Sequence, residues 1–148
     1  MWISPRFPHL IGLMLFLLAT VLPLRFSRAE DALRGTWTIY YAQHNGRKLE
    51  EFNNIKLSFL GNGKLEMQMP DGELGKGSYQ EDGTRTPKEI DLSIAVGDFL
   101  VTRKSIYTFV DGDLHICQPE SHEGERPATF GSDAGSGCWL WKLKRSKR

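Results

Sequence analysis

The sequence predicts an all-β domain: a single antiparallel meander β-barrel of about eight short strands. Apolar and polar residues alternate along several stretches after residue 29, which is the period of a half-buried strand. Turn-forming residues separate most of these stretches, and no segment after residue 29 keeps a helical period of 3.6. Closing the meander into a barrel would remove exposed sheet edges, and a β-sandwich is the alternative arrangement.

The alternation is clearest at the two ends of the domain. Trp37 and Ile39 share one face of the first strand, and Trp141 and Leu143 share one face of the last. The predicted strands cover residues 35–41, 55–59, 65–69, 74–80, 89–94, 104–110, 114–118 and 138–145. A further short strand is expected at residues 128–130, while residues 53–54 and 95–102 fit either a loop or a short helix.

Glycine and asparagine mark the tightest turns. Asn45-Gly46 tolerates positive φ at both positions, which is typical of a two-residue hairpin turn. The strings at 61–63 (GNG), 70–72 (PDG) and 111–113 (DGD) are read in the same way. Residues 119–137 are rich in Pro, Gly and Ser and are expected to form a long loop.

Residues 1–29 have the pattern of a secretory signal peptide. Arg6 and His9 precede an apolar stretch at residues 10–24, which is shorter than the roughly 20 residues of a bilayer span. Small residues at Ser27 and Ala29 predict cleavage after Ala29, and an uncleaved N-terminal anchor is the alternative. In both cases the domain is expected to be exported, to the periplasm or the extracellular space.

The predicted mature domain, residues 30–148, has a nearly balanced charge. Residues 1–29 contain three arginines and no Lys, Asp or Glu, so 16 of the 19 basic residues face all 18 acidic ones and the net charge is −2. This length suits one domain with its own core. The balance argues against a nucleic-acid-binding protein, and the apolar content argues against a disordered one.

Several short strings, in this order, resemble an uncharacterised and mostly secreted domain family of planctomycetes and their relatives, described as lipocalin-like. They are Gly35-Thr36-Trp37, Asn45-Gly46, 87–92 (PKEIDL), Ile106-Tyr107, 111–114 (DGDL) with Cys117, Arg126-Pro127 with Phe130, and Leu143-Lys144-Arg145. The resemblance spans residues 33–145 and implies a small β-barrel. It brings no established activity, substrate or catalytic residue, and Cys138 with the adjacent Trp-Leu-Trp run departs from the pattern.

The Gly-x-Trp string also resembles the opening motif of lipocalins, where the tryptophan closes one barrel end under a basic residue of the last strand. Arg145 shares a face with Trp141 and Leu143, so it is the residue expected to stack on Trp37. An ordinary core tryptophan with an unrelated terminal arginine is the alternative.

The two cysteines end one predicted strand and begin the next long one. Antiparallel pairing of these strands would let Cys117 and Cys138 face each other, so a disulfide closing a loop of about 20 residues is predicted. Two separate buried thiols are the alternative.

The sequence predicts no catalytic site, metal site or cofactor. Among His44, His115 and His122 no pair has the spacing of a helical zinc site, and there is no Cys-x-x-Cys. Ser121-His122-Glu123 lacks the nucleophile turn of a hydrolase, and the nearby glutamates are read as a solvated acidic loop.

The barrel is expected to be a non-catalytic binding module for a small apolar or amphipathic ligand. Gly75 and Gly77 are the place where missing side chains would leave space. The predicted ligand-binding residues are Trp37, Phe59, Met67, Tyr107, Trp139 and Trp141. The alternative is a filled barrel that serves as a structural or protein-interaction module at the cell envelope, with an envelope protein rather than a small ligand as its partner.

Overall fold

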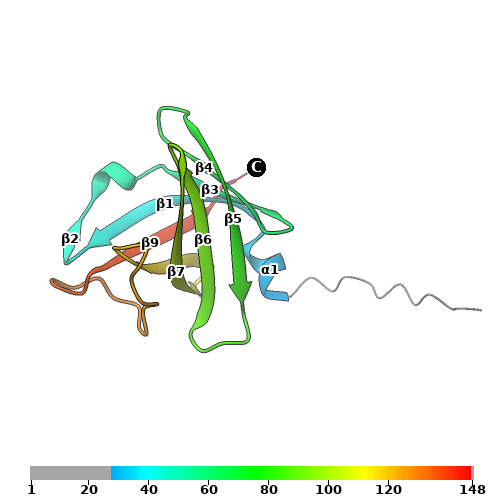
Figure 1. Ribbon diagram of the computed structural model, residues 1–148. Coiled ribbons are helices and arrows are strands. Elements are labelled where there is room, and N and C mark those ends of the chain that lie inside the picture. Colours follow the sequence, from blue (N-terminus) through cyan, green and yellow to red (C-terminus); the bar gives the residue numbers. More distant parts are fainter. Residues whose placement is uncertain (1–27, 148) are drawn as a thin grey trace, which may run out of the picture.

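Strand β1 (Gly35–His44) closes the sheet, because it pairs with β3 (Lys56–Gly61) along one edge and with β9 (Cys138–Arg145) along the other. The structure is a computed structural model that describes residues 28–147. Every neighbouring pair of strands is antiparallel, so eight strands form one continuous meander barrel (Figure 1). The predicted all-β barrel is confirmed, and the closure excludes the β-sandwich.

The remaining elements follow in chain order. They are α1 (Arg28–Leu33), β2 (Arg47–Lys48), the 3₁₀ helix η1 (Glu50–Phe52), β4 (Lys64–Gln68), β5 (Leu74–Asp82), β6 (Lys88–Val96), β7 (Phe99–Val110) and β8 (Asp113–Pro119). Strand β2 lies outside the barrel and pairs only with the end of β1, across the predicted turn at Asn45-Gly46. Both turn residues have positive φ, 49° and 80°, as that turn requires.

Three segments differ from the sequence-based expectation. Residues 95–102 continue β6 and β7 through a tight turn, and no alternation marks them because Phe99 and Leu100 are both exposed. Residues 128–130 form no strand and belong to the long loop. The unpredicted helix α1 contains the predicted cleavage site after Ala29, while residues 1–27 of the predicted signal lie outside the described residues.

One end of the barrel is closed by α1, Trp37 and Arg145. Trp37 is buried, and its indole N–H donates to the Leu33 carbonyl at 2.8 Å. The Arg145 guanidinium lies 4.2 Å from the centre of the Trp37 ring and donates to the carbonyls of Arg34 at 2.7 Å and Ala32 at 2.8 Å. Carbonyls at the end of a helix lack partners in the next turn, and Arg145 donates to two carbonyls at the end of α1.

Gly35 is required for this close approach. Its φ is +122°, which favours glycine, and a Cβ there would lie 2.7 Å from Arg145 Nη1. The register places Trp37 directly opposite Arg145, which explains why the two residues meet although they are far apart in the chain.

The half of the barrel next to α1 is filled by large side chains. Phe59, Leu65 and Tyr107 are almost completely buried there, and Tyr79 is nearly so. The hydroxyl of Tyr107 donates to Glu81 at 3.1 Å, and that of Tyr79 lies 3.4 Å from Glu30. Burial and these carboxylates raise the pKa of Tyr79 to about 12 and raise the pKa of Tyr107 as well, so both phenols stay protonated donors at neutral pH.

The loop between β8 and β9 is fastened to the barrel wall at two places. Arg126 donates to the Ser105 carbonyl at 2.6 Å and to Asp91 at 2.7 Å. Ser132 is buried, with its hydroxyl 2.9 Å from the Gln43 carbonyl. These contacts hold the loop over the outer face of β8.

The predicted disulfide between Cys117 and Cys138 is wrong, because both residues are free thiols. The β8–β9 register places Cys117 opposite Leu140 and Cys138 opposite Pro119, so the two cysteines are diagonal rather than facing. Diagonal residues in an antiparallel pair lie about 7–8 Å apart, beyond the usual Cα separation of a disulfide. The Cys117 thiol donates to the Gly131 carbonyl at 3.4 Å, under the loop, and lies near the unbonded Cys138 thiol. Burial and this second thiol both raise the pKa of Cys117.

Replacing Arg145 by alanine is expected to lower the free energy of unfolding by about 1–2 kcal/mol, since the cation–π contact and two charge-assisted hydrogen bonds are lost. Urea unfolding followed by tryptophan fluorescence measures this change. Lys147→Ala, in the same C-terminal segment, is the matched control and is expected to stay within about 0.5 kcal/mol of the original protein. Equal effects of the two changes would contradict the closure described above.

Intact mass spectrometry is expected to give the same protein mass before and after reduction, and alkylation of the unfolded chain should add a label at each of its two cysteines. In the folded protein Cys117 should react more slowly than Cys138, because Cys117 is buried and burial raises the pKa of its thiol. A mass two hydrogens lighter before reduction would show a disulfide and contradict the free thiols.

Candidate functional site

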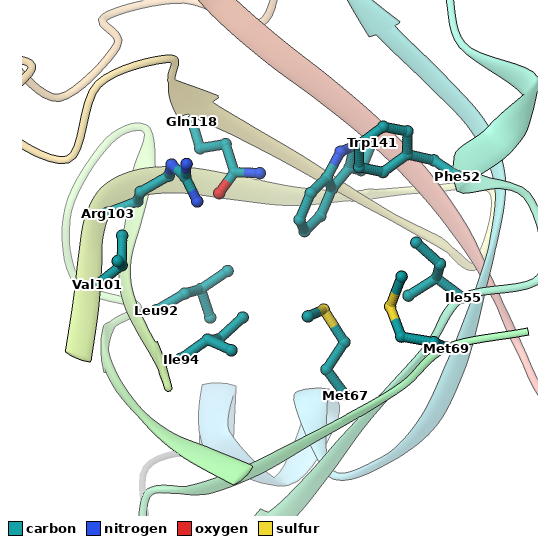
Figure 2. Close-up of a pocket in the computed structure, with 10 residues that line it drawn as sticks. All are labelled: Phe52, Ile55, Met67, Met69, Leu92, Ile94, Val101, Arg103, Gln118 and Trp141. Atoms are coloured by element: carbon teal, nitrogen blue, oxygen red, sulfur yellow. The ribbon is translucent and has the colours of Figure 1, made fainter. Parts of the chain in front are cut away.

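A cavity of about 150 Å³ lies at the end of the barrel opposite α1. The start of β7 and the end of β8 border the cavity. The register places these strand ends far from the Trp37–Arg145 pair, which closes the end beside α1. The cavity is lined by Phe52, Ile55, Met67, Met69, Leu92, Ile94, Val101, Arg103, Gln118 and Trp141 (Figure 2).

Strand alternation brings most of these side chains inward. Leu92 and Ile94 are two apart on β6, and Val101 and Arg103 are two apart on β7, directly opposite Ile94 and Leu92 in the register. The segment around η1 adds Phe52 and Ile55, and the Phe52 ring packs against Trp141 with a centroid separation of 6.2 Å. The site is therefore built on paired strands and covered in part by one short connection.

The walls of the cavity are apolar except along one side. Figure 2 shows the polar ends of Arg103 and Gln118 and the indole of Trp141 along that side, with Leu92, Ile94 and the two methionines across from them. Gln118 is 97% buried, since only 3% of its surface is exposed. A ligand with an apolar body and one polar head would match both sides.

Two buried donors on this polar side have no acceptor. Arg103 Nε and Trp141 Nε1 have no hydrogen-bond partner among residues 28–147, and no ion pair involves Arg103 there. Burial lowers the pKa of the Arg103 guanidinium, and no carboxylate offsets that desolvation. A buried donor without a partner costs about 1–3 kcal/mol, so this arrangement is unfavourable for the empty barrel.

Glycine 75 contributes to the space. It pairs with Met67 on β4, and a Cβ added at this position would lie 3.8 Å from Ile94 Cγ2, inside ordinary contact distance. Gly77 has a different role, since its Cβ would lie 2.1 Å from the Ser93 carbonyl oxygen and the two strands approach closely there. The sequence predicted space at both glycines, and the structure has it beside Gly75 but not beside Gly77.

The structure divides the predicted ligand-binding residues into two groups. Met67 and Trp141 line the cavity. Trp37, Phe59 and Tyr107 lie in the filled half beside α1, and Trp139 stacks on His44 at 4.2 Å outside the cavity lining. The predicted aromatic set is therefore not assembled around one ligand.

Sequence reasoning missed Arg103 because the predicted strand began at residue 104. A usable signal was present: stepping back by two from the inward-facing Tyr107 gives Ser105, Arg103 and Val101. The exposed residues Phe99 and Leu100 concealed the alternation farther along this strand. Alternation places Ile55 and Gln118 on the inner face of their predicted strands without marking them as cavity residues, and Phe52 lies in a connection that was not predicted as a strand.

The ionisable residues that were weighed for catalysis or metal binding stay apart. Ser121, His122 and Glu123 lie in an exposed turn, with the side chains of His122 and Glu123 61% and 85% exposed. Within residues 28–147 no group of three His, Cys, Asp or Glu side chains could hold a metal ion. The pKa of His115, on the outer face of β8, is lowered by burial and by Lys142.

The chain matches no family model, no curated protein and no solved structure. The planctomycete-type resemblance read from the sequence thus stays a prediction. Within the described part of the chain, no helix has the length and apolar character needed to cross a membrane.

Replacing Arg103 by methionine is expected to leave the free energy of unfolding unchanged or raise it by up to about 1 kcal/mol, because a buried donor without a partner is removed. Lys104→Met, which removes the same charge from the exposed neighbouring position, is the matched control and should change stability by less than about 0.5 kcal/mol. Chemical denaturation of the three proteins measures the difference. A loss of more than about 1 kcal/mol in Arg103→Met alone would mean that Arg103 stabilises the fold through a partner.

Proposed function

We propose that this protein is an exported, non-catalytic binding module for a small apolar or amphipathic ligand. The observation that carries the proposal is the cavity of about 150 Å³ at one end of a barrel whose other end is filled and closed. An eight-stranded barrel has room for its own side chains or for one small ligand. In this barrel, side chains fill the half beside α1, and the cavity for a ligand lies in the other half.

The composition of the cavity wall supports binding rather than catalysis. Arg103 is the one ionisable side chain among the ten lining residues, and the lining contains no carboxylate, histidine, cysteine or hydroxyl. A general acid, a general base and a nucleophile all require such groups within reach of a substrate. The remaining lining offers apolar contact, an amide and an indole N–H.

The volume sets the size of the ligand. An apolar cavity of this volume in another small protein holds one benzene molecule. The ligand body is therefore about the size of a single ring or a short acyl chain, and any longer portion would extend through the open end.

Export is proposed from the sequence of residues 1–29, with its short apolar stretch and the small residues near Ala29. The lipocalin-like resemblance to a mostly secreted family supports the same compartment.

One observation favours the alternative role of an interaction module at the cell envelope. Phe99 and Leu100 are 77% and 66% exposed beside the β6–β7 turn, which Figure 1 shows at the same end of the barrel as the β4–β5 turn. Exposed neighbouring apolar side chains of this size are typical of contact sites. If this role is correct, Phe99→Ser with Leu100→Ser should abolish capture of an envelope protein while leaving ligand binding intact.

The binding proposal is tested by titrating the protein with benzene and following methyl NMR signals. Saturable shifts are expected at cavity residues such as Met67 and Ile94. Gly75→Val should weaken benzene binding about tenfold or more, because its side chain enters the space next to Ile94. Lys76→Val adds the same side chain at the exposed neighbouring position and should bind benzene like the original protein.

Thermal unfolding verifies that both valine variants are folded. Equal benzene affinities of the original protein and of folded Gly75→Val would overturn the proposal of a binding cavity.

A further inference from the structure

The cavity holds a positive charge that the protein does not neutralise. Arg103 faces an otherwise uncharged lining, and its Nε is buried without an acceptor among residues 28–147. The side chain of Arg103 is partly buried, and desolvating part of a charged group without a partner is costly, so its place in the lining needs an explanation. An arginine on the outer face of β7 would keep its charge in solvent. The register instead places Arg103 on the inner face, opposite Leu92.

Carboxylates on neighbouring elements are engaged elsewhere. Asp91 accepts from Arg126 at 2.7 Å on the outer wall, and Glu120 lies 3.3 Å from His44. Neither forms an ion pair with Arg103, and burial is the sole cause that lowers the pKa of this arginine. These neighbouring carboxylates therefore leave Arg103 without a counter-charge, which an anionic ligand would supply.

We propose that the ligand of this cavity is a small monocarboxylate, with its carboxylate bound by Arg103 and its apolar body packed against Leu92, Ile94 and Met67. The inference rests on the binding function proposed above and specifies its ligand class. Figure 2 shows the geometry that it needs, with the guanidinium on one side of the cavity and the aliphatic and methionine side chains on the other.

A carboxylate fits the donors better than other head groups do. It is planar and only accepts hydrogen bonds, and the planar fork of a guanidinium matches its two oxygens. The Trp141 indole N–H, also buried without an acceptor, and the amide of Gln118 lie on the same side of the cavity and offer further donors. A neutral ligand would leave the arginine uncompensated, and a cationic ligand would add repulsion.

The volume limits the rest of the molecule. A cavity of about 150 Å³ accommodates a body such as the ring of benzoate or a short branched acyl group. Benzoate and its neutral isostere benzamide therefore form a suitable probe pair, since they share the ring and differ in the charge of the head group.

The test compares the dissociation constants of benzoate and benzamide by NMR titration. The original protein is expected to bind benzoate roughly 10- to 100-fold more tightly, the range of a charge-assisted hydrogen-bonded pair. Arg103→Met should lose this preference. Lys104→Met removes the same charge from the exposed neighbouring position and should keep the preference.

A second measurement needs no variant. The ¹⁵N-detected Nε–H signal of Arg103 should shift when benzoate is added and should not shift with benzamide. Thermal unfolding of both methionine variants shows whether each is folded, and the arginine signal decides the question if Arg103→Met is not.

The outcomes separate this inference from the binding function itself. Binding of benzene together with equal affinities for benzoate and benzamide would overturn the monocarboxylate ligand and leave the binding module intact. Equal loss of preference in Arg103→Met and Lys104→Met would also overturn it, because long-range attraction would then explain the effect. Failure of all three probes to bind would overturn the binding function.

Discussion

The pairing of β1 with both β3 and β9 is the constraint on which the rest of this structure depends. It turns a simple meander into a barrel without exposed edges and places Trp37 opposite Arg145. The arginine then covers the indole and binds the carbonyls of α1, so one end is sealed by a few residues from the two ends of the domain. Closure and sealing are therefore consequences of one register.

The same register creates an asymmetry along the barrel axis. Large aromatic residues fill the half next to α1, while the other half has glycine at position 75 and flexible methionines in the wall. Space remains in that half, and a charged side chain points into it. The unpartnered Nε of Arg103 disfavours the empty protein, which is the usual relation between a binding site and stability. The filled half supplies the rigidity that such a site requires.

Local sequence signals predicted most of the framework. The alternation around Trp37 and Trp141 located the first and last strands, and Asn45-Gly46 located its turn, because these patterns depend on residues close in the chain. The disulfide prediction failed for the opposite reason. Adjacent strands were inferred correctly, yet a register difference of two residues separates Cys117 from Cys138, and register depends on packing around the whole barrel.

The sequence by itself determined the strand class, the meander order and the turns, since hydrophobic period and turn chemistry are local properties. The pair that closes one end was expected from the resemblance to the lipocalin opening motif, and the register between β1 and β9 decided it. Only the tertiary structure decided where space remains and what faces it. It moved Trp37, Phe59 and Tyr107 out of the candidate site and brought Arg103 into it. A cavity is the difference between the volume enclosed by distant strands and the volume of their side chains, and no short stretch of sequence contains that quantity.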